Sequence, residues 1–156
     1  MLKPVLAMIL SMAAAMAACA DEPMTPEAVT EAARAGVLFV SNDHIAARQA
    51  GNPGLLLLDV RTEREYTLGH IPGADWMARG VIEFRLAETV RDADAEIIVY
   101  CATGSRAALV VKALGAQGYA NVSAHEGFDT WAGDGRPVEN AYGTFTLVER
   151  ADSKAR

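Results

Sequence analysis

One cysteine of this sequence stands where a thiol can become reactive. Cys101 follows the apolar run 97–100, which predicts a buried strand, and the small-residue segment 102–106 separates it from an alanine- and leucine-rich helix predicted at 107–117. The N-terminus of a helix offers unpaired N–H groups and the positive end of the helix dipole, and both stabilise an anion. We therefore predict that Cys101 acts as a thiolate nucleophile.

The chain contains a second cysteine, Cys19, at the end of an N-terminal segment with the composition of a secretory signal. In this segment, 1–20, Lys3 is the one charged residue, and the apolar run after it is too short to cross a bilayer. Cleavage before Asp21 removes Cys19, whereas cleavage before Cys19, at a sequence that resembles a lipobox, leaves it as a lipidated N-terminus. Both alternatives leave Cys101 as the only free thiol of the mature domain, which is reactive, pairs with a cysteine of another protein, or is a buried, inert side chain.

The composition limits the partners of the mature domain. We expect an exported domain in the periplasm, in solution or anchored to a membrane through lipidated Cys19. The 156 residues carry a net charge of −6 and contain no block of basic residues, which argues against nucleic acid as a partner. Because an acidic surface does not attract anions from a distance, local groups must bind any anionic substrate. The sequence leaves the oligomeric state open.

Helices and strands alternate along the chain. Helices are expected at 26–35, 43–49, 63–68, 81–90 and 107–117, with one helical turn at 128–132, and strands at 37–40, 55–60, 74–76, 97–100 and 122–124. This order predicts an α/β fold: a single domain whose mostly parallel central sheet of about five strands is flanked by helices on both faces. Ligands of such sheets bind beyond the C-terminal ends of the strands, where Cys101 lies.

The expected organisation has four parts: a signal segment at 1–20, a linker and N-terminal helix at 21–36, the domain at 37–140 and a C-terminal tail at 141–156. The chain is expected to leave the core near Pro137. The tail shows only a weak alternation of apolar and polar residues at 145–148.

Three groups of residues, in order and at normal spacing, resemble the signature motifs of the single-domain rhodaneses, which are thiosulfate-type sulfurtransferases. They lie within 59–74, in the cysteine loop 101–106 and within 126–138, with Glu126 where the family usually has its first glycine. The resemblance extends over residues 37–138. It implies a rhodanese-like fold for this part of the chain.

The length of the cysteine loop favours sulfur chemistry over phosphate chemistry. Sulfurtransferases of this family have six residues from the cysteine to the arginine, as in Cys101 to Arg106, whereas related phosphatases and arsenate reductases have one more and accommodate a tetrahedral oxyanion. The resemblance implies that Cys101 takes a sulfane sulfur from thiosulfate or a persulfide, holds it as a persulfide and passes it to cyanide or a thiol. This reaction needs no metal and no cofactor. The alternative is a rhodanese-fold module that binds a partner or carries a persulfide with little turnover.

The substrate-binding residues are expected within the loop: Ala102, Thr103, Gly104, Ser105 and Arg106. Glycine and small neighbours let the backbone curl around one sulfur atom. The hydroxyls of Thr103 and Ser105 either donate to the persulfide or cap the following helix, and capping is the favoured alternative. The neutral loop interior, where many thiosulfate-using members have a further basic residue, favours a persulfidic or protein donor.

Charged residues near the loop have two possible roles. Arg106 either clamps an anionic donor or pairs with a carboxylate such as Asp59 or Glu65. Asp59 and Arg61 end a strand expected to be buried, where charges need partners, and we expect them to support the loop structurally.

Two histidines also belong to the motifs. His70 lies in a turn and is expected to be structural. His125 ends the strand before the third motif, where it either reaches the mouth of the pocket or, as the favoured alternative, is a partly exposed histidine at the rim.

Overall fold

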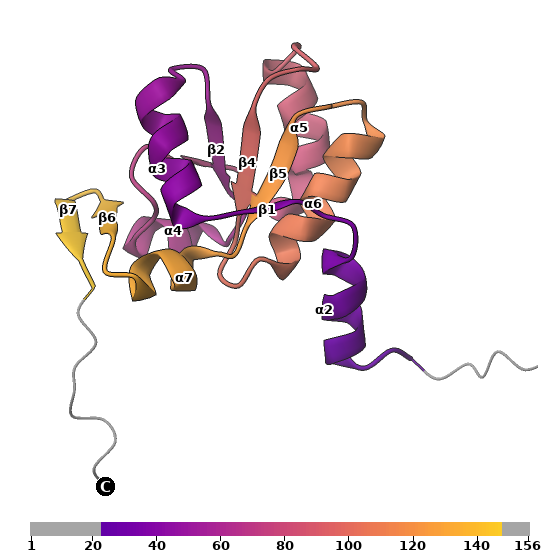
Figure 1. Ribbon diagram of the computed structural model, residues 1–156, viewed down its shortest axis with the longest axis horizontal. Helices are drawn as coiled ribbons and strands as arrows, with labels where there is room; N and C mark the ends of the chain where they lie inside the picture. Colours follow the sequence, from indigo (N-terminus) through magenta and orange to yellow (C-terminus); the bar gives the residue numbers. More distant parts are fainter. Residues whose placement is uncertain (1–22, 148–156) are drawn as a thin grey trace, which may run out of the picture.

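The computed structural model describes residues 23–147, so the expected signal segment 1–20, Cys19 and the residues after 147 lie outside the described part. Five parallel strands form the central sheet in the order β1-β5-β4-β2-β3 (Figure 1). Their bounds are β1 Phe39–Val40, β2 Leu56–Asp59, β3 Asp75–Trp76, β4 Ile97–Tyr100 and β5 Val122–His125. The prediction of an α/β domain with a parallel sheet of about five strands is confirmed.

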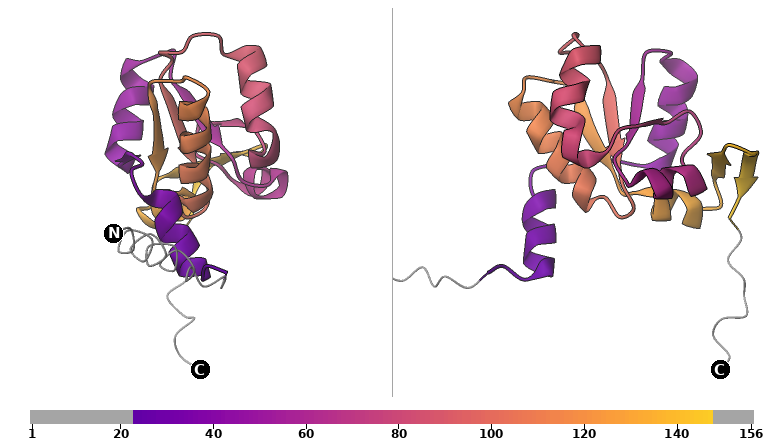
Figure 2. Two further views of the ribbon diagram at one scale, coloured as in Figure 1. Left: turned by 90° about the vertical axis from the view of Figure 1, so that its right-hand side faces the viewer. Right: turned by 180° about the vertical axis from the view of Figure 1, so that it is seen from behind.

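Helices cover both faces of this sheet, as Figures 1 and 2 show. On one face lie α5 (Ile82–Thr89), which the short 3₁₀ helix η1 (Arg79–Val81) precedes, and α6 (Ser105–Ala116). On the other face lie α3 (Asn42–Gly51) and α7 (Phe128–Gly133). The N-terminal helix α2 (Pro26–Arg34) packs against α6, and α4 (Glu63–Leu68) follows β2.

The central strand β4 explains why the sheet has two cores. All four of its residues are buried, and it pairs with β2 on one side and β5 on the other. Because side chains alternate along a strand, Ile97, Val99 and Cys101 pack toward α5 and α6, while Ile98 and Tyr100 pack toward α3 and α7. The pattern therefore places Cys101 at the carboxyl end of the most buried strand, on the α6 face.

Capping residues set several helix starts as the sequence predicts. The hydroxyl of Thr25 accepts from Ala28 N–H at the start of α2, and Thr62 and Glu65 form a complete capping box on α4. Helix α6 differs from the prediction. Its N-cap is Gly104, at φ 86°, with no side-chain cap, so the expected capping by Thr103 or Ser105 is wrong.

The C-terminal hairpin is the largest difference from the sequence-based expectation. Strands β6 (Pro137–Asn140) and β7 (Gly143–Thr146) pair antiparallel, so regular structure crosses the boundary expected at residue 140. The chain does not leave the core near Pro137, because Val138 is fully buried. Backbone bonds between Glu139 and His70 join β6 to the turn after α4. Within residues 23–147, no helix has the length and apolarity that a membrane span requires.

Candidate functional site

The loop after β4 is tied to the protein through its carbonyl groups. Phe128 N–H donates to the carbonyl of Cys101 at 2.7 Å and Asp129 N–H to that of Ala102 at 3.1 Å, both from the first turn of α7. The guanidinium of Arg34 donates to the carbonyl of Thr103 at 3.3 Å. These three bonds hold successive peptide oxygens on the outside of the loop.

The N–H groups of the same peptides have the opposite orientation. A peptide bond is planar and trans, so an N–H points away from the carbonyl with which it shares a peptide unit. Among the residues that the structure describes, the N–H groups of Ala102, Thr103 and Gly104 donate to no protein acceptor. Together with the start of α6, they are available to an anion on the buried sulfur of Cys101.

Two glycines make the loop compact. A Cβ on Gly127 would lie 2.1 Å from the carbonyl oxygen of Ala102 and 2.7 Å from the nitrogen of Thr103, and its φ is +118°. A Cβ on Gly104, at φ +86°, would meet the guanidinium of Arg34 at 2.7 Å. At Gly127 only glycine allows the two backbone segments to approach this closely, and at both positions the positive φ favours glycine. The loop is therefore packed against α7 on one side and α2 on the other.

Arg106 lies between the loop and α4. Its guanidinium donates to the carboxylate of Glu65 at 3.0 Å, so of the two expected carboxylate partners the structure selects Glu65. This bond, and those from Thr62, lower the pKa of Glu65 to about 2. The pKa of Arg106 is raised chiefly by Glu65 and also by the nearby sulfur of Cys101. The charge of Arg106 is thus largely compensated before any substrate binds.

Asp59 and Arg61 form a buried ion pair at the end of β2. The Arg61 guanidinium donates to both carboxylate oxygens of Asp59, at 2.7–3.0 Å, and to the carbonyl of Gly69 at 2.7 Å. It also lies 4.1 Å from the ring centroid of Phe128. This pair connects β2, the turn after α4 and the start of α7.

His70 lies in the turn after α4. Its Nδ1 lies 3.0 Å from the carbonyl of Tyr66, so Nδ1 is the protonated nitrogen and donates to that carbonyl.

The expectation of a partly exposed rim histidine at His125 is wrong, because the side chain is fully buried at the end of β5. Its Nδ1 accepts from Gly127 N–H at 3.1 Å, so Nε2 carries the proton and donates to Asn42 Oδ1 at 2.6 Å. The amide of Asn42 in turn donates to Asp134 at 2.5 Å. Burial lowers the pKa of His125 to about 4. The neutral ring therefore holds Gly127, which packs against Ala102 of the cysteine loop.

Arg34 is a residue near the site that the sequence did not indicate. It pairs with Glu126 at 2.6 Å and stacks on the ring of Phe39, 3.9 Å from its centroid. This pair gives Glu126, the departure from the family motif, a partner on the N-terminal helix. No local signal in the sequence predicts a contact over 92 positions.

A cleft of about 330 Å³ adjoins the loop. It reaches the loop at Ala102, and most of its wall is apolar, formed by Leu68, Gly69, Phe128, Val138, Phe145 and Leu147. Three charged residues, Arg61, Glu65 and Asp129, also line it. In residues 23–147, no group of three or more His, Cys, Asp or Glu side chains is arranged to hold a metal ion.

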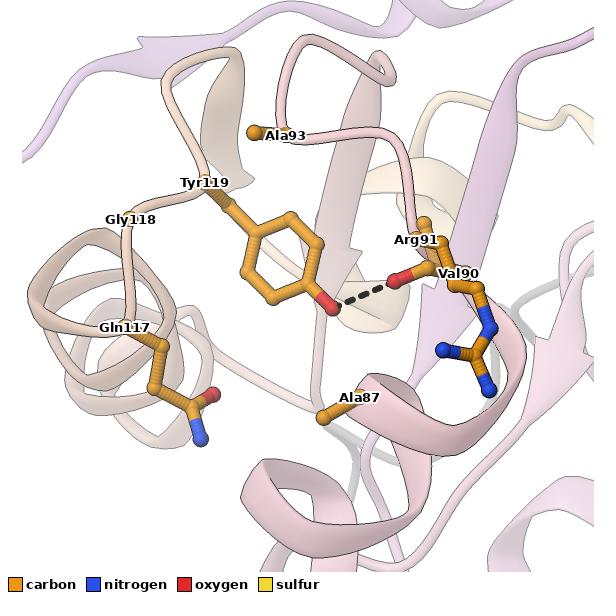
Figure 3. Close-up of a pocket in the computed structure, with 7 residues that line it drawn as sticks. All are labelled: Ala87, Val90, Arg91, Ala93, Gln117, Gly118 and Tyr119. Carbon is orange, nitrogen blue, oxygen red and sulfur yellow. Dashed lines mark hydrogen bonds between the residues drawn. The ribbon is translucent and has the colours of Figure 1, made fainter.

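A larger cavity, about 470 Å³, lies at the opposite end of the sheet (Figure 3). It opens between the end of α5 and the end of α6, where the hydroxyl of Tyr119 donates to the carbonyl of Val90 at 2.7 Å. Arg91 and Gln117 also line it. No cysteine lines this cavity, so its size does not make it the site of thiol chemistry.

The chain is similar to known proteins in sequence and in structure. The family model described as "Rhodanese-like domain" matches residues 42–134. A sulfurtransferase of Allochromatium vinosum is 31% identical over 100 residues, which are 64% of this chain and 92% of the relative. The thiosulfate:glutathione sulfurtransferase of Saccharomyces cerevisiae is 31% identical over 96 residues, 54% of this chain and 69% of the relative. The polysulfide-sulfur transferase homodimer of Wolinella succinogenes has a similar structure, with a TM-score of 0.63 at 28% identity over 83% of this chain and 90% of its own.

Proposed function

Because the chain belongs to the rhodanese-like sulfurtransferase family, we propose that it transfers a sulfane sulfur through a persulfide on Cys101. One observation carries the proposal: the carbonyl groups of Cys101, Ala102 and Thr103 are held outward, which leaves the N–H groups of a six-residue loop available to the sulfur. These N–H groups stabilise a thiolate and, after transfer, the charged outer sulfur of a persulfide.

The first half-reaction forms the persulfide. The thiolate of Cys101 attacks the outer sulfur of the donor, the sulfur–sulfur bond of the donor breaks, and its electron pair leaves with the remainder of the donor. With thiosulfate the leaving group is sulfite, and with a persulfide R–S–SH it is the thiolate R–S⁻. In the second half-reaction cyanide or a thiol attacks the outer sulfur and releases the Cys101 thiolate.

The surrounding residues hold the loop in the geometry that this reaction requires. We assign Arg106 to the loop–α4 contact through Glu65, and Asp59, Arg61 and His70 to structural support. Ala102 and Gly104 contribute backbone alone, since neither has a polar side-chain atom, and the hydroxyls of Thr103 and Ser105, which make no cap, stay available to the persulfide. Arg34 and His125 support the same loop from α2 and β5.

Intact-mass measurement tests the reaction. Incubation of the purified protein with thiosulfate or glutathione persulfide is expected to add one sulfur atom, which cyanide removes as thiocyanate. The adduct is expected to be absent from Cys101→Ser and unchanged in Cys19→Ser. Thiocyanate in large molar excess over protein indicates a turning-over enzyme, whereas one equivalent indicates a carrier module. Absence of an adduct with every sulfane donor would overturn the proposal.

Export is a separate proposal, which rests on the composition of residues 1–20. The domain then acts in the periplasm, in solution or attached through a lipid on Cys19. Incorporation of labelled palmitate that Cys19→Ala abolishes supports the lipid anchor, whereas a mature N-terminus at Asp21 supports ordinary cleavage.

A further inference from the structure

The cleft beside the cysteine loop has a wall that lies outside the part of the chain matched by the family model. Val138, Phe145 and Leu147 line it, and all three lie beyond residues 42–134, the part that the family model matches. They belong to the hairpin β6–β7 and the residue that follows it. Backbone bonds between Glu139 and His70 hold the hairpin against the turn after α4.

Side chains from three segments converge on the floor of this cleft. A Cβ placed on Gly69 would lie 2.7 Å from Val138 Cγ1, 3.7 Å from Phe145 Cζ and 3.8 Å from Phe128 Cζ. Toward solvent, Leu68 is 68% and Leu147 46% exposed at the same cleft. Large apolar side chains that gather at a concave surface are typical of a binding site.

The charges around the cleft do not favour a doubly charged donor. Arg61 is engaged by both oxygens of Asp59, and Arg106 by Glu65. Asp129, which lines the cleft, is exposed and adds a negative charge. Of the residues that line the cleft, the one cation, Arg61, is compensated by Asp59, and both Glu65 and Asp129 are carboxylates, so charge complementarity with the dianion thiosulfate is poor.

We infer that the cleft binds the apolar body of a small organic sulfane donor, and so directs its outer sulfur to Cys101. This inference rests on the proposed sulfurtransferase function. A volume of about 330 Å³ suits a small molecule rather than a protein segment, and the cleft joins the reactive loop at Ala102. The donor class is an organic persulfide or thiosulfonate with an apolar group, in place of an inorganic dianion.

Two thiosulfonates make a matched pair of probes. Benzenethiosulfonate and methanethiosulfonate, R–SO₂–S⁻, carry the same single charge and the same reacting sulfur, and differ in the apolar group. Attack by the Cys101 thiolate on the outer sulfur breaks the S–S bond of the donor, and the electron pair leaves with the sulfinate R–SO₂⁻. The new persulfide retains the negative charge of the attacking thiolate, and cyanide then removes the sulfur as thiocyanate. No oxidant or reductant is needed.

The test compares kcat/KM for the two donors, each divided by its uncatalysed rate with cyanide. Benzenethiosulfonate is expected to be preferred by about 10-fold, the order of discrimination that an apolar pocket gives. Phe145→Ser and Leu147→Ser are each expected to lower the preference about threefold, because each removes apolar contact area. Phe84→Ser is the matched control, since Phe84 is 74% exposed on α5, away from the cleft.

Each result decides the inference. The inference would be overturned if the wild-type protein showed no preference between the two donors. It would also be overturned if Phe145→Ser and Leu147→Ser changed the preference no more than the control Phe84→Ser does. Either result would point to a macromolecular occupant. Thermal melting of all variants identifies any that do not fold. Persulfide formation on Cys101 is scored separately by mass, so a failed cleft is distinguished from a failed sulfurtransferase.

Discussion

The two ends of the sheet each have a cavity, and the smaller of the two adjoins the reactive residue. At the carboxyl end, a cleft of about 330 Å³ borders the cysteine loop; at the amino end, a cavity of about 470 Å³ surrounds Tyr119. What makes the carboxyl end the reactive one is the orientation of its backbone N–H groups, not the volume of its cleft. The parallel strands direct the start of α6 and the loop N–H groups to the carboxyl end, where an anion is stabilised.

The ends also differ in how tightly their loops are connected. At the carboxyl end, the cysteine loop is bonded to α7 and α2, and hydrogen bonds from buried His125 through buried Asn42 to exposed Asp134 support it. At the amino end, the bonds from Tyr119 to Val90 and from Ala120 to Ala93 join the neighbouring loops. We therefore expect substitutions at the carboxyl end to affect both stability and activity, and those at the amino end to affect stability alone.

The largest expected effect is the loss of stability and activity on replacing Gly127, in comparison with Gly118, which also has a positive φ. Gly127→Ala is expected to cost about 4 kcal/mol of unfolding free energy, since overpacking and a disfavoured φ each contribute about 1–3 kcal/mol. Its sulfur-transfer rate is expected to fall about 100-fold, because misplacement of reacting groups by about 1 Å has that effect. Gly118→Ala is the amino-end control: its φ is +103°, but nothing lies within 4 Å of the added Cβ.

For Gly118→Ala we expect a loss of about 1–2 kcal/mol from the disfavoured φ, and wild-type activity. Denaturant unfolding and thiocyanate release measure both quantities. Equal loss of activity in the two variants would contradict the difference between the two ends.

His125 makes the stability of the carboxyl end depend on pH. Its pKa is about 4 in the folded protein, against 6.5 ordinarily, so between these values the unfolded chain binds more protons. The stability contribution is complete above pH 6.5 and is lost as the pH falls toward 4, by about 3 kcal/mol. Glu126, Asp134 and Arg136 also act on this pKa, with smaller effects than burial.

The measurement is the unfolding free energy of the wild type and of His125→Gln between pH 4 and pH 7. The variant is expected to be less stable than the wild type at pH 7. Its unfolding free energy is expected to change less between pH 4 and pH 7, and the difference from the wild-type change is expected to be about 3 kcal/mol. Parallel curves for the two proteins would show that His125 does not titrate in this range.

The smallest expected effect lies at the amino end. Tyr119→Phe removes the hydrogen bond to Val90 and is expected to cost about 1 kcal/mol of stability, the usual net value of one bond. Thermal melting measures this loss, and the sulfur-transfer rate is expected to stay at the wild-type value. A clear loss of rate would show that the two ends of the sheet are coupled.

Most of the fold follows from patterns that are local in the sequence. Apolar runs such as 55–60 and 97–100 indicate strands buried on both faces, and their alternation with helices implies a parallel sheet. Thr25 and the Thr62–Glu65 box mark helix starts, because their bonds close within three residues. The hairpin β6–β7 was not predicted, since its apolar residues are few and its contact with His70 is distant in sequence.

The position of Cys101 between a strand and a helix, and the length of its loop, were determined by the sequence alone, because both depend on neighbouring residues. Only the tertiary structure decided what surrounds the loop. Arg106 pairs with Glu65, and His125 is buried beneath the loop. Arg34 of α2 binds both Glu126 and the carbonyl of Thr103. Such contacts join residues far apart in the chain, and they form only where the folded sheet brings the carboxyl ends of its strands together.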